Sequence, residues 1–137
     1  MKQMPDKAFI DTNIFFYLYS ADEPEKRRKI EDTIANYSCI TSIQALNELN
    51  NILIKKLKLP VDEIKAVIAE ITTFYTITKV DLSVIEQALD LHAEYQYSYY
   101  DCLMLSSALM SGCTQIFTED MQNGQIIRKQ LVIKNIC

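Results

Sequence analysis

The sequence predicts a three-layer α/β/α fold, in which a mainly parallel sheet of about five strands lies between two layers of helices. Short apolar segments rich in β-branched residues alternate along the chain with longer segments of helical periodicity. Strands and helices that alternate in this way form a parallel sheet with helices on both faces. The 137 residues contain only two glycines and three prolines, which is too few for a loop-rich fold.

Apolar runs and capping residues define the predicted elements near the amino terminus. Residues 8–10 form an apolar run that predicts a buried strand, and helical periodicity begins near Ile14. Asp22 and Pro24 are typical of the cap and the first turn of a helix, which we expect to reach Ala35.

A second strand and two further helices follow. Residues 38–41 have the composition of a short strand. Thr41 and Gln44 have the spacing of a capping box, which predicts a helix to about Lys58. Pro60 begins another helix, whose apolar residues recur at helical spacing: Ile64, Val67, Ile68 and Ile71.

The next segment predicts a third strand and two helices. Residues 75–80 alternate and are rich in β-branched side chains. Asp81 is expected to cap a helix, and Ser98 and Asp101 have the spacing of a second capping box before the apolar helix 102–110. The apolar face predicted for the helix after Asp81 consists of Leu82, Ile85, Leu89 and Ala93.

The last elements are short. Gly112 is expected to end the preceding helix, as a glycine just beyond a helix does. Residues 115–117 predict a fourth strand, 122–124 a turn and 131–133 a final strand.

The chain shows no division into parts, so we expect a single domain over residues 1–137. No apolar run reaches the ~18 residues that span a bilayer, and no signal-peptide core is present, so we expect a cytoplasmic protein with no membrane anchor. The cysteines form no C-x-x-C pair, which indicates reduced thiols rather than a zinc site. They are Cys39, Cys102, Cys113 and Cys137.

The net charge of −4 argues against nucleic-acid binding. If four acids are held at a metal centre, however, the remaining acids (18 − 4 = 14) balance the 14 lysines and arginines. Three groups of basic residues either follow phosphates or form solvated helix faces, and the sequence leaves both readings open. They are residues 26–29, Lys55 and Lys56 with Lys58, and Arg128 with Lys129.

Four separated acids are predicted to meet at one edge of the sheet. Asp11 and Asp120 lie at or just beyond the carboxyl ends of predicted strands. Asp101 lies in the first turn of a predicted helix, and Glu48 lies about two turns into another. Because strand carboxyl ends and helix amino ends share the edge at which ligands bind, the four side chains are expected to converge. Their repulsion requires a cation among them.

Oxygen ligands without histidine or cysteine favour Mg²⁺ or Mn²⁺ over zinc. Such an ion activates water and neutralises charge on a phosphoryl group, which suits hydrolysis of a phosphodiester bond. Simpler roles stay open for two of the acids, since Asp101 also fits a helix cap and Asp120 also fits a turn. Glu48 has only Asn51 and Ile52 at the following helical positions, so no local ion pair accounts for it.

Four motifs stand in order along the chain. They are Phe9–Asn13, Thr41–Gln44 with Asn47–Leu49, Ser98–Asp101 with Leu103–Ala108, and Phe117–Asp120 with Gln122–Gln125. In order and spacing these motifs resemble those of the PIN-domain ribonuclease family, in the variety common among toxins of VapBC-type toxin–antitoxin pairs. The resemblance extends over nearly the whole chain.

The resemblance implies endoribonuclease activity that depends on Mg²⁺, with Mn²⁺ as a substitute, together with a homodimer and a small cognate antitoxin. It implies that Asn13 and Thr118 support the site by orienting its ligands without binding the metal themselves. The metal-binding catalytic acids that it implies are Asp11, Glu48, Asp101 and Asp120.

Two functions other than a nuclease are also compatible with parts of the sequence. Asp11 follows a strand, as a phosphoryl-accepting aspartate does, but the second acid expected two positions later is Asn13. A catalytically silent PIN-like binding module is the other alternative, and the presence of all four acids argues against it.

The remaining aromatic and imidazole side chains are expected to pack. His92 lies near the apolar stripe of its helix, where it is expected to pack or to lie at the margin of the stripe rather than to act as a base. A cluster of four tyrosines either packs or stacks on bases, and packing is favoured. The cluster consists of Tyr95, Tyr97, Tyr99 and Tyr100.

Overall fold

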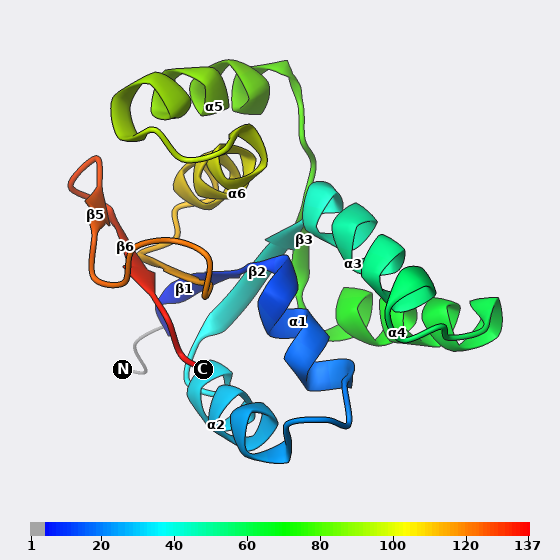
Figure 1. Cartoon of the computed structure of the whole chain (residues 1–137). Coiled ribbons are helices and arrows are strands. Elements are labelled where there is room, and N and C mark those ends of the chain that lie inside the picture. Colours follow the sequence, from blue (N-terminus) through cyan, green and yellow to red (C-terminus); the bar gives the residue numbers. More distant parts are fainter. Residues whose placement is uncertain (1–4) are drawn as a thin grey trace.

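A six-stranded sheet crosses the middle of the molecule in the computed structural model, which describes residues 5–137 (Figure 1). The first four residues of the predicted 1–137 domain lie outside the described residues. The strand order is β3-β2-β1-β4-β6-β5, and all neighbours are parallel except β5 and β6. The strands are β1 (Lys7–Ile10), β2 (Ser38–Ser42), β3 (Thr76–Thr78), β4 (Gln115–Phe117), β5 (Ile126–Ile127) and β6 (Leu131–Lys134).

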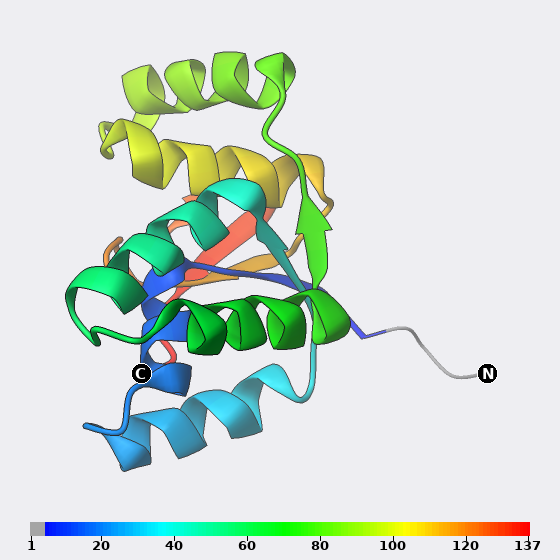
Figure 2. The same cartoon turned by 90° about the vertical axis from the view of Figure 1, so that its right-hand side faces the viewer.

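In the part of the chain that the structure describes, six helices cover the two faces of the sheet, which confirms the predicted three-layer fold. They are α1 (Thr12–Tyr19), α2 (Pro24–Ile34), α3 (Ile43–Lys55), α4 (Val61–Phe74), α5 (Leu82–Tyr95) and α6 (Tyr99–Met110). In Figure 2, α5 and α6 lie on one side of the sheet, and α2 and α4 lie on the other.

Alternating strand residues supply two hydrophobic cores. In β1, Phe9 joins the core beneath α5 and α6, whereas Ala8 and Ile10 join the core formed with α1 to α4. The same alternation separates Ile116 from Phe117 in β4. All five side chains are fully buried, and burial of a large apolar side chain stabilises the fold by about 1.5–3 kcal/mol. The central strands are thus held from both faces.

Two helix starts differ from the prediction. Helix α2 begins with Pro24, but its N-cap is Glu23 rather than Asp22, and no side chain caps it. Helix α3 is capped by Ser42, which accepts a hydrogen bond from the backbone N–H of Ala45. Thr41, the predicted cap, lies one residue earlier. Its hydroxyl donates instead to a backbone carbonyl of the neighbouring strand β1.

Two further differences concern short-range geometry. Helix α3 ends at Lys55, three residues before the predicted end, and Lys58 has a positive φ of 51° that no helix continues through. Strand β5 was not predicted, because its two residues are too few to show a period. The predicted glycine stop of α6 is confirmed, since Gly112 has φ +76°.

The predicted apolar face of α5 is wrong except at Ile85, which is partly buried against the core. The helix buries Val84, Ala88 and Leu91, whereas Leu82 is 68% exposed and Leu89 is 54% exposed. Both sets of residues recur at helical spacing, so periodicity alone does not choose between them. The choice depends on the packing of α5 against α6, which the sequence does not show locally.

The tyrosine cluster packs, as predicted, except at one position. Tyr95, Tyr97 and Tyr99 contact the core beneath α5 and α6, whereas Tyr100 is 57% exposed. His92 is exposed, and its Nδ1 lies 2.5 Å from the carbonyl oxygen of Tyr97.

All four cysteines are free thiols. Within residues 5–137, no helix combines the length and the apolar character that a membrane span requires.

The two sides of α5 should differ sharply in their effect on stability. Leu91→Ala should lower the free energy of unfolding by about 2–5 kcal/mol, because it opens a cavity in the core. Leu89→Ala, two residues earlier, should change it by no more than about 0.5 kcal/mol. Urea denaturation of both variants measures the difference, and equal effects would show that the burial pattern of α5 is wrong.

Candidate metal centre

The carboxyl ends of β1 and β4 lie side by side at the centre of the sheet. The chain proceeds from β1 to β2 and β3 on one side and later to β4 and β6 on the other, so the strand order switches here. Ligands of open α/β sheets bind at such switch points. Asp11 and Thr118 directly follow β1 and β4, and the backbone N–H of Asp11 donates to the carbonyl of Phe117 (3.1 Å).

Three of the four predicted acids meet at this switch point. Asp11, Asp101 and Asp120 each offer one carboxylate oxygen, and these three oxygens lie within 4.8 Å of one another. Ser98 caps α6 as predicted, because its hydroxyl accepts a bond from the backbone N–H of Asp101 (3.2 Å). The Asp101 carboxylate contributes one oxygen to the cluster from this first turn of α6.

Asp11 is the most deeply buried acid of the cluster, with 4% of its surface exposed. Its Oδ1 accepts a bond from the backbone N–H of Thr12 (2.7 Å), and its Oδ2 accepts one from the hydroxyl of Thr118 (2.8 Å). Burial nevertheless raises the pKa of Asp11 to about 6, and the charges of Asp101 and Asp120 add to this rise. Ionisation of this carboxylate at neutral pH therefore costs free energy.

Glu48 lies beside the three aspartates but outside the group whose oxygens fall within 4.8 Å. Its Oε2 is buried and has no hydrogen-bond partner among the described residues. Burial, followed by the charges of Asp11 and Asp101, raises the pKa of Glu48 to about 7. A buried carboxylate oxygen without a partner is rare in folded proteins and indicates a missing cation or proton.

Asn13 joins the two strand ends. Its Nδ2 donates to Asp120 Oδ2 (2.8 Å) and to Thr118 Oγ1 (3.4 Å), and its Oδ1 accepts a bond from the backbone N–H of Glu119 (3.4 Å). Thr118 Oγ1 also accepts the backbone N–H of Asp120 (3.2 Å) while it donates to Asp11. The two predicted supporting residues thus contact both strand-end aspartates.

Sequence reasoning missed one contact beside this network. The hydroxyl of Tyr17 donates to Glu119 Oε1 at 2.6 Å. Tyr17 lies one helical turn after Asn13 on α1, and Glu119 lies between Thr118 and Asp120. The four-residue spacing from Asn13 is the only local signal that points to Tyr17.

The donor set fits a hard divalent cation. All the converging atoms are carboxylate oxygens, the ligands that Mg²⁺ and Mn²⁺ prefer. Burial, with a smaller contribution from the neighbouring carboxylates, raises the pKa values of Asp11 and Glu48, so it is costly to hold both groups ionised, and such an ion would offset that cost.

Two of the predicted basic groups are engaged by acids at the surface. Arg27 Nε lies 3.5 Å from Glu31 Oε1, one turn further along α2. Arg128 Nη2 lies 2.7 Å from Glu94 Oε1, and Arg128 Nε donates to Glu94 Oε2. For these two groups the contacts favour the reading as solvated surface charge.

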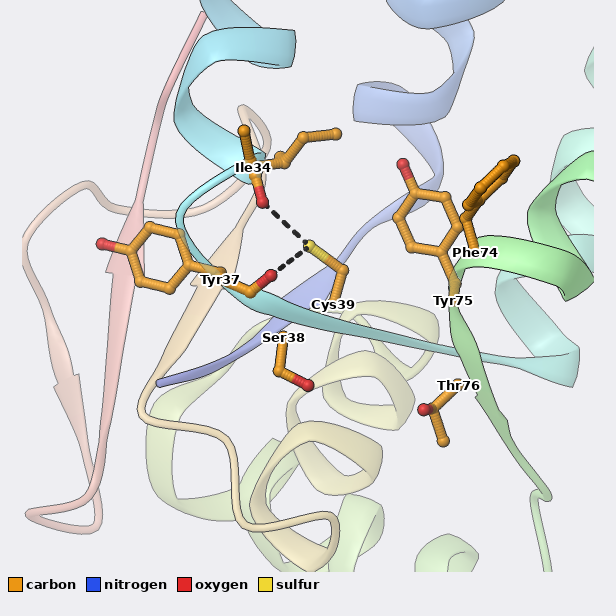
Figure 3. Close-up of a pocket in the computed structure, with 8 residues that line it drawn as sticks. Ile34, Tyr37, Ser38, Cys39, Phe74, Tyr75 and Thr76 are labelled. Atoms are coloured by element: carbon orange, nitrogen blue, oxygen red, sulfur yellow. Dashed lines mark hydrogen bonds between the residues drawn. The ribbon is translucent and has the colours of Figure 1, made fainter. Parts of the chain in front are cut away.

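A separate hollow of about 310 Å³ lies at the amino ends of β2 and β3, on the opposite edge of the sheet from the carboxylates (Figure 3). Cys39 faces it, and its thiol donates to the carbonyls of Ile34 (3.6 Å) and Tyr37 (3.7 Å). Burial raises the pKa of Cys39 to about 11, so the thiol stays protonated and is a poor nucleophile. This hollow takes no part in the carboxylate site.

Solved structures with the same fold include three proteins of toxin–antitoxin systems. The chain is 20% identical to a toxin–antitoxin complex from Klebsiella pneumoniae, with 91% of this chain and 95% of that one covered and a TM-score of 0.68. The chain is 18% identical to VapBC2 from Rickettsia felis, which was solved bound to a promoter DNA fragment. The match covers 94% of this chain and 98% of that one, with a TM-score of 0.68. The chain is 21% identical to VapC20 from Mycobacterium tuberculosis, a toxin that cleaves the sarcin–ricin loop. The match covers 80% of this chain and 86% of that one, with a TM-score of 0.66.

The sequence itself matches one family model. No curated protein matches the chain significantly in sequence. The model of the PIN domain matches residues 8–125, which include all four predicted acids. The resemblance of the four motifs is confirmed, and the chain belongs to the PIN domain family.

Proposed function

We propose that this protein is a metal-dependent endoribonuclease that hydrolyses phosphodiester bonds of RNA, and that it is the toxin of a VapBC-type toxin–antitoxin pair. The convergence of Asp11, Asp101 and Asp120 at the switch point carries the proposal. RNA as the substrate is supported by VapC20, which shares the fold and is a toxin that cleaves the sarcin–ricin loop.

Asp11, Asp101 and Asp120 would hold one Mg²⁺, with Mn²⁺ as a substitute, and Glu48 would complete that site or contact a second ion. When bound, such an ion activates water and stabilises negative charge on the phosphoryl oxygens. The proposed assignment gives the unpaired Glu48 Oε2 a partner and places a positive charge beside Asp11, whose pKa is raised by burial and, to a smaller extent, by Asp101 and Asp120.

Asn13 and Thr118 would orient these ligands. The Thr118 hydroxyl donates to Asp11 Oδ2. This hydrogen bond fixes the orientation of the carboxylate, and therefore the direction of its remaining lone pairs. The Asn13 amide donates to Asp120 Oδ2 and restrains an exposed side chain that two neighbouring aspartates repel.

The partners we propose are a small antitoxin and a second copy of the chain, acting in the cytoplasm. Support comes from proteins of the same fold: the Klebsiella pneumoniae structure is a toxin–antitoxin complex, and VapBC2 from Rickettsia felis was solved on promoter DNA.

Removal of one ligand should abolish RNA cleavage. Asp11→Asn and Asp101→Asn should each lower the cleavage rate with Mg²⁺ by at least about a hundredfold, because each removes a charged ligand. Asp90→Asn, an exposed aspartate on α5, should cleave at the wild-type rate. EDTA should abolish cleavage without unfolding the chain. Cleavage by either ligand variant at the wild-type rate would contradict the assignment, and an inactive wild type would favour a silent binding module.

The metal-free chain should lose stability as the pH rises from about 5 to about 7. The pKa values of Asp11 and Glu48 are raised to about 6 and about 7, so the folded chain holds more protons in this range than the unfolded chain. The free energy of unfolding should fall by on the order of 3 kcal/mol as these protons leave. Urea denaturation in EDTA measures this decrease, which Mg²⁺ should reduce. A stability that rises over the same range would refute the described electrostatics.

Expression should distinguish a toxin from a nuclease of another role. Induction of the wild-type chain in a bacterial culture should stop growth, because cleavage of cellular RNA blocks protein synthesis. Induction of Asp11→Asn to the same protein level should leave growth unchanged. Normal growth with active wild-type enzyme would contradict the toxin role and leave the nuclease proposal standing.

A further inference from the structure

We infer that Tyr17 and Lys26 form a tether that positions Asp120 through Glu119. The inference rests on the proposed function, because it assigns Asp120 to the metal site. Tyr17, Lys26 and Glu119 are positioning residues here, since none of them belongs to the group of converging oxygens.

Helix α1 holds the segment after β4 at two points one turn apart. Asn13 contacts the side chain of Asp120 and the backbone of Glu119. Tyr17, four residues later, donates its hydroxyl to Glu119 Oε1 at 2.6 Å, a short bond of the kind that carboxylate acceptors form. Asn13 and Tyr17 lie on the same face of α1, one turn apart, and their side chains contact two consecutive residues of the segment.

Lys26 extends the tether to α2. Its Nζ donates to the hydroxyl oxygen of Tyr17 (3.4 Å) and lies 4.6 Å from the centre of the Tyr17 ring. It also lies 3.5 Å from Glu23 Oε2. The ammonium group therefore contacts both the hydroxyl and the ring of Tyr17 and places a positive charge near Glu119.

The tether answers a specific electrostatic problem. Glu119 and Asp120 are adjacent acids, and the Asp120 carboxylate approaches Asp11 and Asp101 within 4.8 Å. Repulsion within this group favours movement of the exposed Asp120 towards solvent. Tyr17 holds the Glu119 side chain, and the backbone joins that side chain to Asp120. Loss of the tether therefore removes one side-chain restraint from the short stretch between the buried residues Thr118 and Met121, where the repulsion acts.

A purely structural contact would have different consequences. If Tyr17 and Glu119 only attach α1 to the end of β4, their loss lowers stability and leaves the affinity for metal unchanged. If they position Asp120, metal affinity falls more than stability does. The affinity of the protein for Mn²⁺, measured by isothermal titration calorimetry, separates the two roles.

The test compares two tyrosines of α1 that each donate to a glutamate. Tyr17→Phe removes the bond to Glu119, and Tyr19→Phe removes the matched bond to Glu70 (2.9 Å), which is not linked to the site. We expect Tyr17→Phe to weaken Mn²⁺ binding about tenfold and Tyr19→Phe to leave it within about twofold of the wild type. Melting temperatures of both variants show whether the fold is retained.

Substitutions of Glu119 test the same tether from its other end. Glu119→Ala should weaken Mn²⁺ binding about as much as Tyr17→Phe, and Glu119→Gln, whose amide oxygen still accepts the tyrosine hydroxyl, should restore most of the affinity. Wild-type affinity in both Tyr17→Phe and Glu119→Ala overturns the positioning role and leaves the proposed function intact. A wild-type chain that binds no Mn²⁺ overturns the metal-dependent function, and the positioning role with it.

Discussion

The repulsion among carboxylates at the ends of β1 and β4 is the constraint on which the rest of the site depends. The sheet order places Asp11 and Asp120 at adjacent strand ends, and α6 brings Asp101 to them. The surrounding polar groups donate hydrogen bonds to these acids rather than compete with them: the backbone of Thr12, the hydroxyl of Thr118 and the amide of Asn13. The local structure of the strand ends therefore follows from the need to hold negative charge in place.

The same topology supplies a partial compensation for this charge. Helices α1, α3 and α6 all begin at the carboxyl edge of the parallel strands, so the positive ends of their dipoles face the acids. Each such end contributes about 0.3–1 kcal/mol. The rise in the pKa of Asp11 to about 6 corresponds to about 3 kcal/mol, and Glu48 adds a cost of similar size. The helix ends alone do not offset these costs, which is the physical reason to assign a divalent cation to the site.

The parts of this structure that were predictable from sequence are those that local patterns determine. Phe9 and its neighbours identify a buried strand, and Asp11 gains its meaning from its place directly after that strand. The buried face of α5 was not predictable, because Leu89 and Leu91 both fit a helical period and only the contact with α6 decides between them. The bond between Tyr17 and Glu119 joins residues 102 positions apart, so the spacing of Tyr17 from Asn13 places it on the same helix face but does not identify its partner.

The site also depends on both helix layers at once. Asp101 comes from the layer of α5 and α6, whereas Glu48 and Asn13 come from helices on the opposite face. A shift of either layer relative to the sheet would separate the acids, so the two cores that sandwich β1 and β4 also fix the spacing of the charges. The Asp120 side chain is exposed, although the chain on either side of it is fixed by the buried residues Thr118 and Met121. The core therefore fixes the backbone near Asp120 but not its exposed carboxylate, and α1 restrains that carboxylate through Asn13 and, by way of Glu119, through Tyr17.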